Sequence, residues 1–329
     1  MLISRRRLLA TSAALAAWPL AARASRAAVR RVPDAPFILD DASRLNATPI
    51  SRQAILASVE ESRLLQEMRA MLGEAASAGR PVAAGGARHS MGGQSLPRNG
   101  IAASFAMPAI EPDTNSRIYR VSAGARWRDV IRVLDPIGFS PAVTQSNHDF
   151  SVGGTLSVNA HGWPVPFGPF STTIRRFRLM LADGSVVVCS ESENPELFRF
   201  AVGGYGLFGI VIDAELRMAE NSLLKPHSEL MMADTFAPRF VARAADPSVR
   251  MLYGRLSVAR EGFLHEALLV DYTPVQPQPD RRSVEKLLGL LVRVPQHLSR
   301  PDRLRTRQAV AVGGRNPSDA PARSGRRHA

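Results

Sequence analysis

A glycine-rich loop at residues 85–94, with the sequence Gly-Gly-Ala-Arg-His-Ser-Met-Gly-Gly-Gln, most constrains what this chain can fold into. Apolar residues recur at helical spacing over 62–78, and Gly79 stands where that helix should end. Residues 81–84 then predict a short strand that runs into the glycines. Such a loop exposes backbone N–H groups that can hold a pyrophosphate without a lysine. On this loop alone, a tight turn with a solvent-exposed histidine is the alternative.

A second glycine segment spans residues 151–162 and has the sequence Ser-Val-Gly-Gly-Thr-Leu-Ser-Val-Asn-Ala-His-Gly. It combines paired glycines, hydroxyl side chains, an amide and a histidine, which is unusual for a core element. This composition favours a ligand site. A turn followed by a buried helix of small residues is the alternative.

A third glycine segment at residues 204–209, Gly-Tyr-Gly-Leu-Phe-Gly, matches the GxGxxG pattern of dinucleotide-binding folds. In those folds the motif leaves a strand and opens a helix, because the pyrophosphate rests on the helix N-terminus. Here the predicted order is reversed, with a helix before the motif and a strand after it. We therefore exclude a Rossmann-type NAD site and expect these glycines to let the backbone pack closely before the strand.

The other elements predict an α+β fold with short elements and no regular βαβ period. Asp183 and Gly184 predict the turn of a hairpin over 175–190. Asn194 and Pro195 predict a helix start, with Asn194 as the capping side chain and proline at the first helical position. Further predictions are strands at 118–122, 210–216, 252–258 and 268–272, and a helix at 127–134.

Six segments in this order resemble the vanillyl-alcohol-oxidase-type flavoproteins, whose FAD domain is called the PCMH type. Their motifs are most similar to those of the cytokinin dehydrogenase and sugar-lactone oxidase branches. The resemblance implies a two-subdomain PCMH-type FAD-binding domain at 51–222, followed by a partial substrate domain at 223–294. The segments that carry it lie at 85–94, 122–127, 151–157, 181–185, 194–198 and 203–210.

The resemblance implies FAD as the cofactor and assigns a part of it to each glycine segment. Residues 86–90 would hold the pyrophosphate, residues 151–157 would lie along the flavin, and Ile210 would approach the adenine side. The implied cofactor-binding residues are Gly86, Ala87, Arg88, His89, Ser90, Gln94, Ser151, Gly153, Gly154, Thr155, Ser157, Asn159 and Ile210.

In covalent members of this family, the histidine of a Gly-His-Ser triplet bonds the 8α carbon of the flavin. The triplet here is Arg88-His89-Ser90, so an arginine replaces the usual small residue and His89 is the candidate for such a bond. Bicovalent members also use a cysteine just before the second glycine segment, and residues 140–150 contain none. The single cysteine, Cys189, excludes an internal disulfide and a cysteine metal cluster, and we assign it to the core.

The resemblance implies oxidation of a small alcohol, sugar or amine, with hydride transfer to flavin N5 while a base takes the donor's proton. His148, Asp149 and His161 flank the second glycine segment, and we take Asp149 and His161 as the catalytic candidates. Cytokinin dehydrogenases place their aspartate a few residues earlier, so the register differs. Each candidate could instead be a hydrogen-bonded polar residue at a turn. The expected electron acceptor is oxygen, a quinone or a cytochrome.

The net charge of +13 lies at the ends of the chain. Residues 1–31 contain seven arginines and no acidic residue, and residues 291–329 contain nine arginines against Asp302 and Asp319. The body between them is close to neutral. Nucleic-acid binding would require a basic stripe with interleaved aromatic residues on the folded body, so we exclude it.

The N-terminus predicts an export signal at residues 1–24. The basic segment Ser4-Arg5-Arg6-Arg7-Leu8-Leu9 precedes an apolar run at 10–22, which is too short to span a bilayer comfortably. The paired arginines resemble the twin-arginine signal, which exports folded proteins, and an ordinary secretory signal is the alternative. Both predict a periplasmic or secreted protein, with an N-terminal extension at 25–50.

Residues 295–329 predict an irregular basic tail, because Arg, Pro, Gly and Ser dominate and apolar periodicity ends. In the resembled family a complete substrate domain follows the FAD domain. We therefore expect a truncated or frameshifted member, whose missing sheet a neighbouring reading frame of the gene should encode. The alternative to a working enzyme is a catalytically incomplete flavin-binding remnant.

Overall fold

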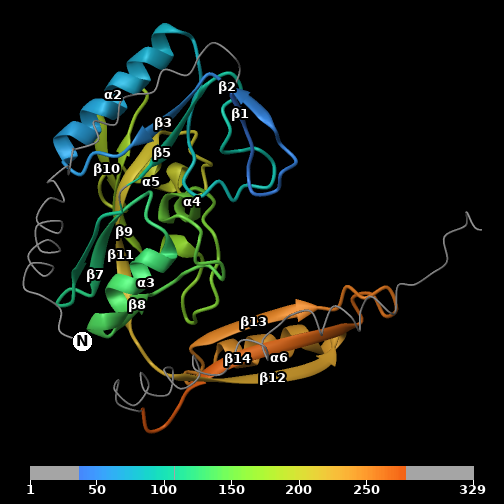
Figure 1. Cartoon of the computed structure of the whole chain (residues 1–329). Coiled ribbons are helices and arrows are strands. Elements are labelled where there is room, and N and C mark those ends of the chain that lie inside the picture. Colours follow the sequence, from blue (N-terminus) through green and yellow to red (C-terminus); the bar gives the residue numbers. More distant parts are fainter. Residues whose placement is uncertain (1–36, 107, 279–329) are drawn as a thin grey trace, which may run out of the picture. The chain divides into compact units, whose positions relative to one another are not determined.

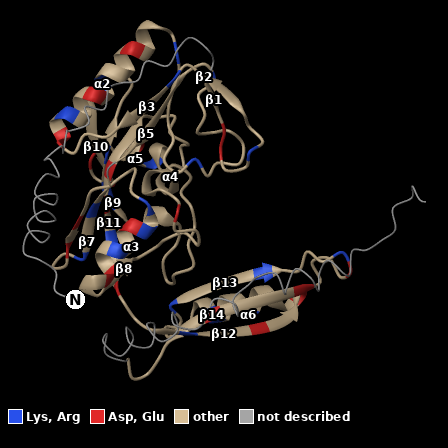
Figure 2. Cartoon of the chain, in the orientation of Figure 1, with Lys and Arg blue, Asp and Glu red and all other residues tan. Residues whose placement is uncertain are grey.

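The computed structural model describes residues 37–106 and 108–278 (Figure 1). The predicted export signal at 1–24 and the tail at 295–329 lie outside the described residues, as do parts of the segments predicted at 25–50 and 223–294. Within the described ranges, no helix is both long and apolar enough to cross a bilayer. Figure 2 shows basic and acidic residues intermixed along the helices α2 (Glu61–Ser77) and α3 (Trp127–Leu134).

A small parallel sheet, in the order β3-β5-β4, carries the first glycine loop at the end of β4. Helix α2 packs on this sheet through Met68, Met71 and Ala75, which recur at the i, i+3, i+7 spacing of one helix face. A two-stranded hairpin, β1-β2, precedes the sheet. The bounds are β1 (Phe37–Leu39), β2 (Thr48–Ile50), β3 (Arg52–Leu56), β4 (Val82–Ala84) and β5 (Ile101–Phe105).

A larger antiparallel sheet has the order β10-β9-β11-β7-β6, and β8 also pairs with β11. Trp127 of α3 is fully buried against it, edge-on to Phe170 with ring centroids 5.6 Å apart. The strands are β6 (Ile110–Asp113), β7 (Ile118–Ser122), β8 (Phe139–Pro141), β9 (Ile174–Met180), β10 (Val186–Ser190) and β11 (Ile210–Glu220). The remaining helices are η1 (Asp135–Ile137), α4 (Val152–Ser157), η2 (Phe170–Thr173) and α5 (Pro195–Ala201).

Strand β11 contributes side chains to the cores of both sheets, because they alternate between faces and a β-bulge between Val211 and Asp213 reverses the alternation. Ile210 and Ile212 belong to the core under α2. Val211, Ala214 and Leu216 belong to the core around Trp127. The cofactor-binding candidate Ile210 is therefore the first residue of a strand whose side chains pack in both cores.

A third sheet, in the order β12-β14-β13, packs one face against helix α6 around Val249, Leu252 and Leu269. Arg243 of α6 donates hydrogen bonds to both carboxylate oxygens of the fully buried Asp271, so this buried charge is paired. The bounds are β12 (Leu224–Met232), α6 (Ala233–Ala244), β13 (Met251–Leu256) and β14 (Glu266–Pro274).

The predicted mixture of helices and strands is confirmed, including the helix at 127–134, the strand at 118–122 and the hairpin over 175–190. The order of a helix before residues 204–209 and a strand after them is also confirmed. The predicted capping role of Asn194 is wrong. Its backbone is left-handed (φ 48°), its side chain makes no capping bond, and its Nδ2 donates to the carbonyl of Val188. The amide thus links the turn before α5 to β10, and it does not cap the N–H groups at the start of the helix.

Candidate functional site

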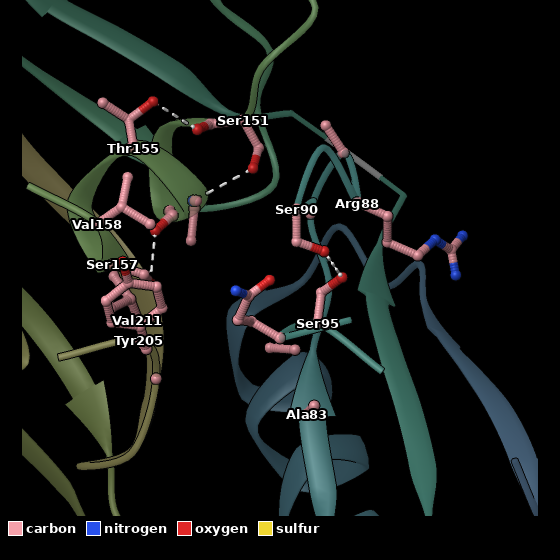
Figure 3. A pocket seen from close by; sticks show the side chains of 18 of the residues that line it. Ala83, Arg88, Ser90, Ser95, Ser151, Thr155, Ser157, Val158, Tyr205 and Val211 are labelled. Atoms are coloured by element: carbon pink, nitrogen blue, oxygen red, sulfur yellow. Dashed lines mark hydrogen bonds between the residues drawn. The ribbon is translucent and has the colours of Figure 1, made fainter. Parts of the chain in front are cut away.

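A cavity of about 450 Å³ lies where the three glycine segments converge. In Figure 3, Ser90, Ser95 and Ala83 lie on one side of it, and Ser157, Val158 and Tyr205 lie on the other. Its volume lies within the range of small-molecule and cofactor sites, about 300–1,000 Å³. The residues that line it come from 82–95, Phe105, Ala123, Gln145, 150–158 and 205–211.

Backbone hydrogen bonds hold the first half of the first glycine loop at two positions. The N–H of Gly85 donates to the carbonyl of Ala103 at 2.8 Å, which continues the pairing of β4 with β5. The N–H of Ala42 donates to the carbonyl of Arg88 at 2.8 Å. The backbone of Arg88 is left-handed (φ 51°). The loop therefore has a defined path between a strand and the N-terminal segment.

The carboxylate of Asp41 accepts hydrogen bonds from the second half of this loop. Its Oδ2 accepts hydrogen bonds from the N–H of Gly93 at 2.8 Å and from the hydroxyl of Ser90 at 3.2 Å. Asn46 adds a hydrogen bond from its amide to the carbonyl of Met91 at 3.2 Å. Hydrogen bonds from Ser43, Gly93 and Asn46 lower the pKa of Asp41 to about 2, which outweighs the opposing effect of burial.

Glycine is required where the first two glycine segments meet. A Cβ on Gly86 would lie 2.0 Å from Ser151 Oγ, and one on Gly153 would lie 2.8 Å from Ala123 Cβ. Ser151 is the N-cap of α4 and accepts a hydrogen bond from the N–H of Gly154 at 3.2 Å. The backbone of one glycine segment is thus in direct contact with the cap of the other.

His89 lines the cavity and contacts Asp149, which does not line it. Its Nε2 lies 3.1 Å from Asp149 Oδ2, and its ring lies 4.7 Å from that of Phe150, centroid to centroid. Asp149 also accepts from Arg128 at 2.5 Å and lies 3.5 Å from Arg126 Nη1. The hydrogen bond from His89, together with the two arginine charges, lowers the pKa of Asp149.

All the predicted cofactor-binding residues except Asn159 line the cavity. Asn159 has a left-handed backbone (φ 43°), and its Oδ1 accepts a hydrogen bond from the N–H of Ser171 at 2.9 Å. The side chain of Asn159 therefore has a structural contact at the start of η2. Of the catalytic candidates, neither Asp149 nor His161 lines the cavity. The exposed His161 contributes its carbonyl to Gln145, which does line it.

Residues of the third glycine segment line the cavity as well, which the sequence analysis missed. The N–H of Tyr205 donates to the carbonyl of Ser157 at 2.8 Å and ties this loop to the end of α4. A Cβ on Gly204 would lie 2.1 Å from the carbonyl oxygen of Phe200, so the expected close packing is present too. The glycines at 204, 206 and 209, which also belong to a segment of the family resemblance, were the available signal. The lining residues are Tyr205, Gly206, Leu207 and Gly209.

The polar groups around the cavity fit an anionic ligand with an apolar part. Arg88 belongs to the cavity lining, but Figure 3 shows its guanidinium directed away from the gap, and its buried Nη1 has no hydrogen-bond partner among the described residues. Burial and the charge of Arg126 lower the pKa of Arg88. The hydroxyl of Ser151 supplies a donor, and glycine backbone lines the gap. No group of metal ligands occurs among the described residues.

The comparisons with known proteins agree with this geometry. Residues 61–190 match the FAD binding domain family. Cytokinin dehydrogenase 4 of Arabidopsis thaliana is 30% identical over 196 residues, which cover 56% of this chain and 37% of that protein. Cytokinin dehydrogenase 1 of the same plant is 34% identical over 146 residues, covering 42% of this chain and 25% of that protein. Cytokinin dehydrogenase 8 of Oryza sativa subsp. japonica is 34% identical over 149 residues, covering 41% and 28%.

This chain therefore spans between 25% and 37% of the length of these curated relatives. The predicted resemblance to FAD-linked oxidoreductases is confirmed by these matches, and so is FAD as the cofactor.

Proposed function

We propose that this chain, which carries an FAD binding domain at residues 61–190, is an FAD-dependent oxidoreductase that oxidises a small alcohol, sugar or amine. Bound FAD would supply the hydride acceptor, its N5 atom. The observation that carries the proposal is the convergence of three glycine segments on one cavity, within and next to the matched region. The names of the matched relatives as dehydrogenases support a redox function.

The cavity supplies separate groups for the two halves of such a cofactor. Residues 86–90 offer backbone N–H groups to the pyrophosphate. Residues 151–157 offer small side chains, so a planar ring system can lie close to the backbone. Ile210, at the start of β11, offers an apolar contact on the adenine side.

His89 is the residue that we propose to bond the flavin covalently. It is the one histidine among the described residues that line the cavity. Its Nε2 is engaged with Asp149, which leaves Nδ1 as the nitrogen available on the other side of the ring. A covalent bond would retain FAD outside the cell, which agrees with our proposal that the protein is exported through the twin-arginine route.

A second candidate function is a flavin-binding protein without turnover. It is favoured by one observation: the described residues that line the cavity include no carboxylate. The titratable side chains among them are Arg88, His89 and Tyr205. A base for the donor's proton would then have to come from outside this lining.

Purified full-length protein distinguishes these functions. We expect bound flavin with its characteristic absorbance, and reduction of a dye acceptor with at least one member of a panel of alcohols, sugars and amines. A protein that holds flavin but reduces no dye with any donor would support the second function. A protein that neither contains flavin nor takes up added FAD would contradict both. Cell fractionation tests the export route, by comparing the location of the wild-type protein with that of a variant in which Arg5 and Arg6 are changed to lysine.

A further inference from the structure

The contact between His89 and Asp149 joins the first glycine loop to the loop before α4. The two residues are 60 positions apart in the chain, and their hydrogen bond is 3.1 Å long. Asp149 is itself held in place: its backbone carbonyl accepts from Arg126 Nη1 at 2.7 Å, and its N–H donates to Asn147 Oδ1 at 2.9 Å. Phe150 packs against the histidine ring from the neighbouring position. The imidazole therefore has few orientations open to it.

The two carboxylate oxygens of Asp149 have different partners. Oδ1 accepts from Arg128, and Oδ2 faces His89 and, at 3.5 Å, Arg126. Both arginine charges favour the ionised carboxylate, which can only accept hydrogen bonds. Nε2 of His89 must therefore carry a hydrogen, and in the neutral ring Nδ1 then carries the free lone pair. The contacts thus select one tautomer of His89.

We propose that Asp149 is a positioning residue that fixes His89 in its Nε2–H tautomer, so that the covalent bond to the flavin forms at Nδ1. This inference rests on the proposed function, because it concerns how FAD becomes attached. It also gives Asp149 a role other than that of the base that takes the donor's proton. A carboxylate shared between His89, Arg126 and Arg128 is a weak proton acceptor.

The bond would join Nδ1 of His89 to the carbon of the flavin 8-methyl group. One C–H bond of the methyl group and the Nε2–H bond would break, which would release two protons and two electrons. Bound FAD would take up the electrons, and dioxygen would remove them with the two protons to give hydrogen peroxide. While the N–C bond forms, the imidazole would be cationic, with its Nε2–H facing the Asp149 carboxylate. The same contact that selects the tautomer therefore also stabilises this charge.

The test measures covalent flavin in the full-length protein, as fluorescence that remains with acid-precipitated protein. We expect acid-stable flavin in the wild type and none in His89→Ala. In Asp149→Asn we expect FAD to bind while the acid-stable fraction falls about tenfold, by analogy with the loss of hydrogen-bond partners that orient metal-bound histidines. Asp129→Asn is the matched control, because Asp129 pairs with Arg132 at 3.0 Å on α3 and should behave as wild type. Asp149→Glu should recover part of the fraction.

A second readout does not depend on the variants. NMR of the flavin-bearing peptide from the wild type should show attachment at Nδ1, and attachment at Nε2 would overturn the inference. Flavin that acid releases from the wild type, or equal acid-stable flavin in Asp149→Asn and wild type, would also overturn it and leave FAD binding standing. An Asp149→Asn protein that cannot take up FAD at all would show that Asp149 builds the cavity instead. Wild-type protein without flavin would contradict the proposed function itself.

Discussion

The carboxylate of Asp41 accepts a hydrogen bond from the backbone N–H of Gly93 at 2.8 Å, across 52 positions of the chain. The same oxygen accepts from the hydroxyl of Ser90, which lines the cavity. The segment before the FAD binding domain match thus determines how the first glycine loop presents its groups. Cofactor binding and the docking of residues 41–46 should therefore depend on each other.

Asp41→Asn should lower the melting temperature and weaken FAD retention. The pKa of Asp41 is about 2 in the folded protein against an ordinary value of 3.8, so folding favours the ionised form. This stabilisation is present above pH 3.8 and is lost as the pH falls through about 2. The difference in melting temperature between wild type and variant should shrink over that window. Thermal denaturation at several pH values measures it, with the exposed Asp234→Asn as the control. A difference that does not change with pH would contradict the assignment.

Gly86→Ala should prevent cofactor loading. The added Cβ would lie 2.0 Å from Ser151 Oγ and 2.6 Å from Ser151 Cβ, so Ser151 would have to leave its capping position. Flavin absorbance per protein after incubation with FAD measures the loss. Gly73→Ala is the matched control, because a Cβ there meets nothing within 4 Å on helix α2. That control should load FAD normally and gain about 0.5–1 kcal/mol of stability. Normal loading in Gly86→Ala would contradict the close approach.

Thr155→Val should destabilise the fold by about 1–3 kcal/mol, the cost of leaving a buried donor without a partner. The indole N–H of Trp127 donates to Thr155 Oγ1 at 3.0 Å, and both residues are buried. Valine keeps the shape of threonine but offers no acceptor. Denaturant unfolding measures the change in free energy. Thr172→Val, at an exposed position in η2, should change it little. An equal effect of the two substitutions would contradict the role of this hydrogen bond.

The thiol of Cys189 should not react with thiol reagents in the native protein. The residue is fully buried in β10, and burial raises the pKa of its thiol to about 11. A colorimetric thiol assay should count no reactive group without denaturant and one group in denaturant, since the chain has a single cysteine. Reaction of the native protein at the rate of the unfolded chain would contradict the assignment to the core.

Periodicity and glycine position in the sequence predicted most of the local elements. The helix at 127–134 and the strand at 118–122 have the predicted bounds, because their apolar residues recur with a period that only one element satisfies. The family resemblance, and FAD as the cofactor that it implies, followed from the order of short motifs along the sequence. The local elements depend on residues a few positions apart, and each short motif is likewise local.

Only the tertiary structure determined which polar groups meet. His89 and Asp149, or Asp41 and Gly93, are joined by loops whose paths no local pattern specifies. The same reason explains why Asn159 was assigned to the cofactor although its side chain fixes η2, and why Tyr205 was not expected at the cavity. The amino-acid sequence thus determined the elements and the class of ligand. The folded chain determined the neighbours of each site residue, because hydrogen bonds depend on distances that are set only once both cores have packed.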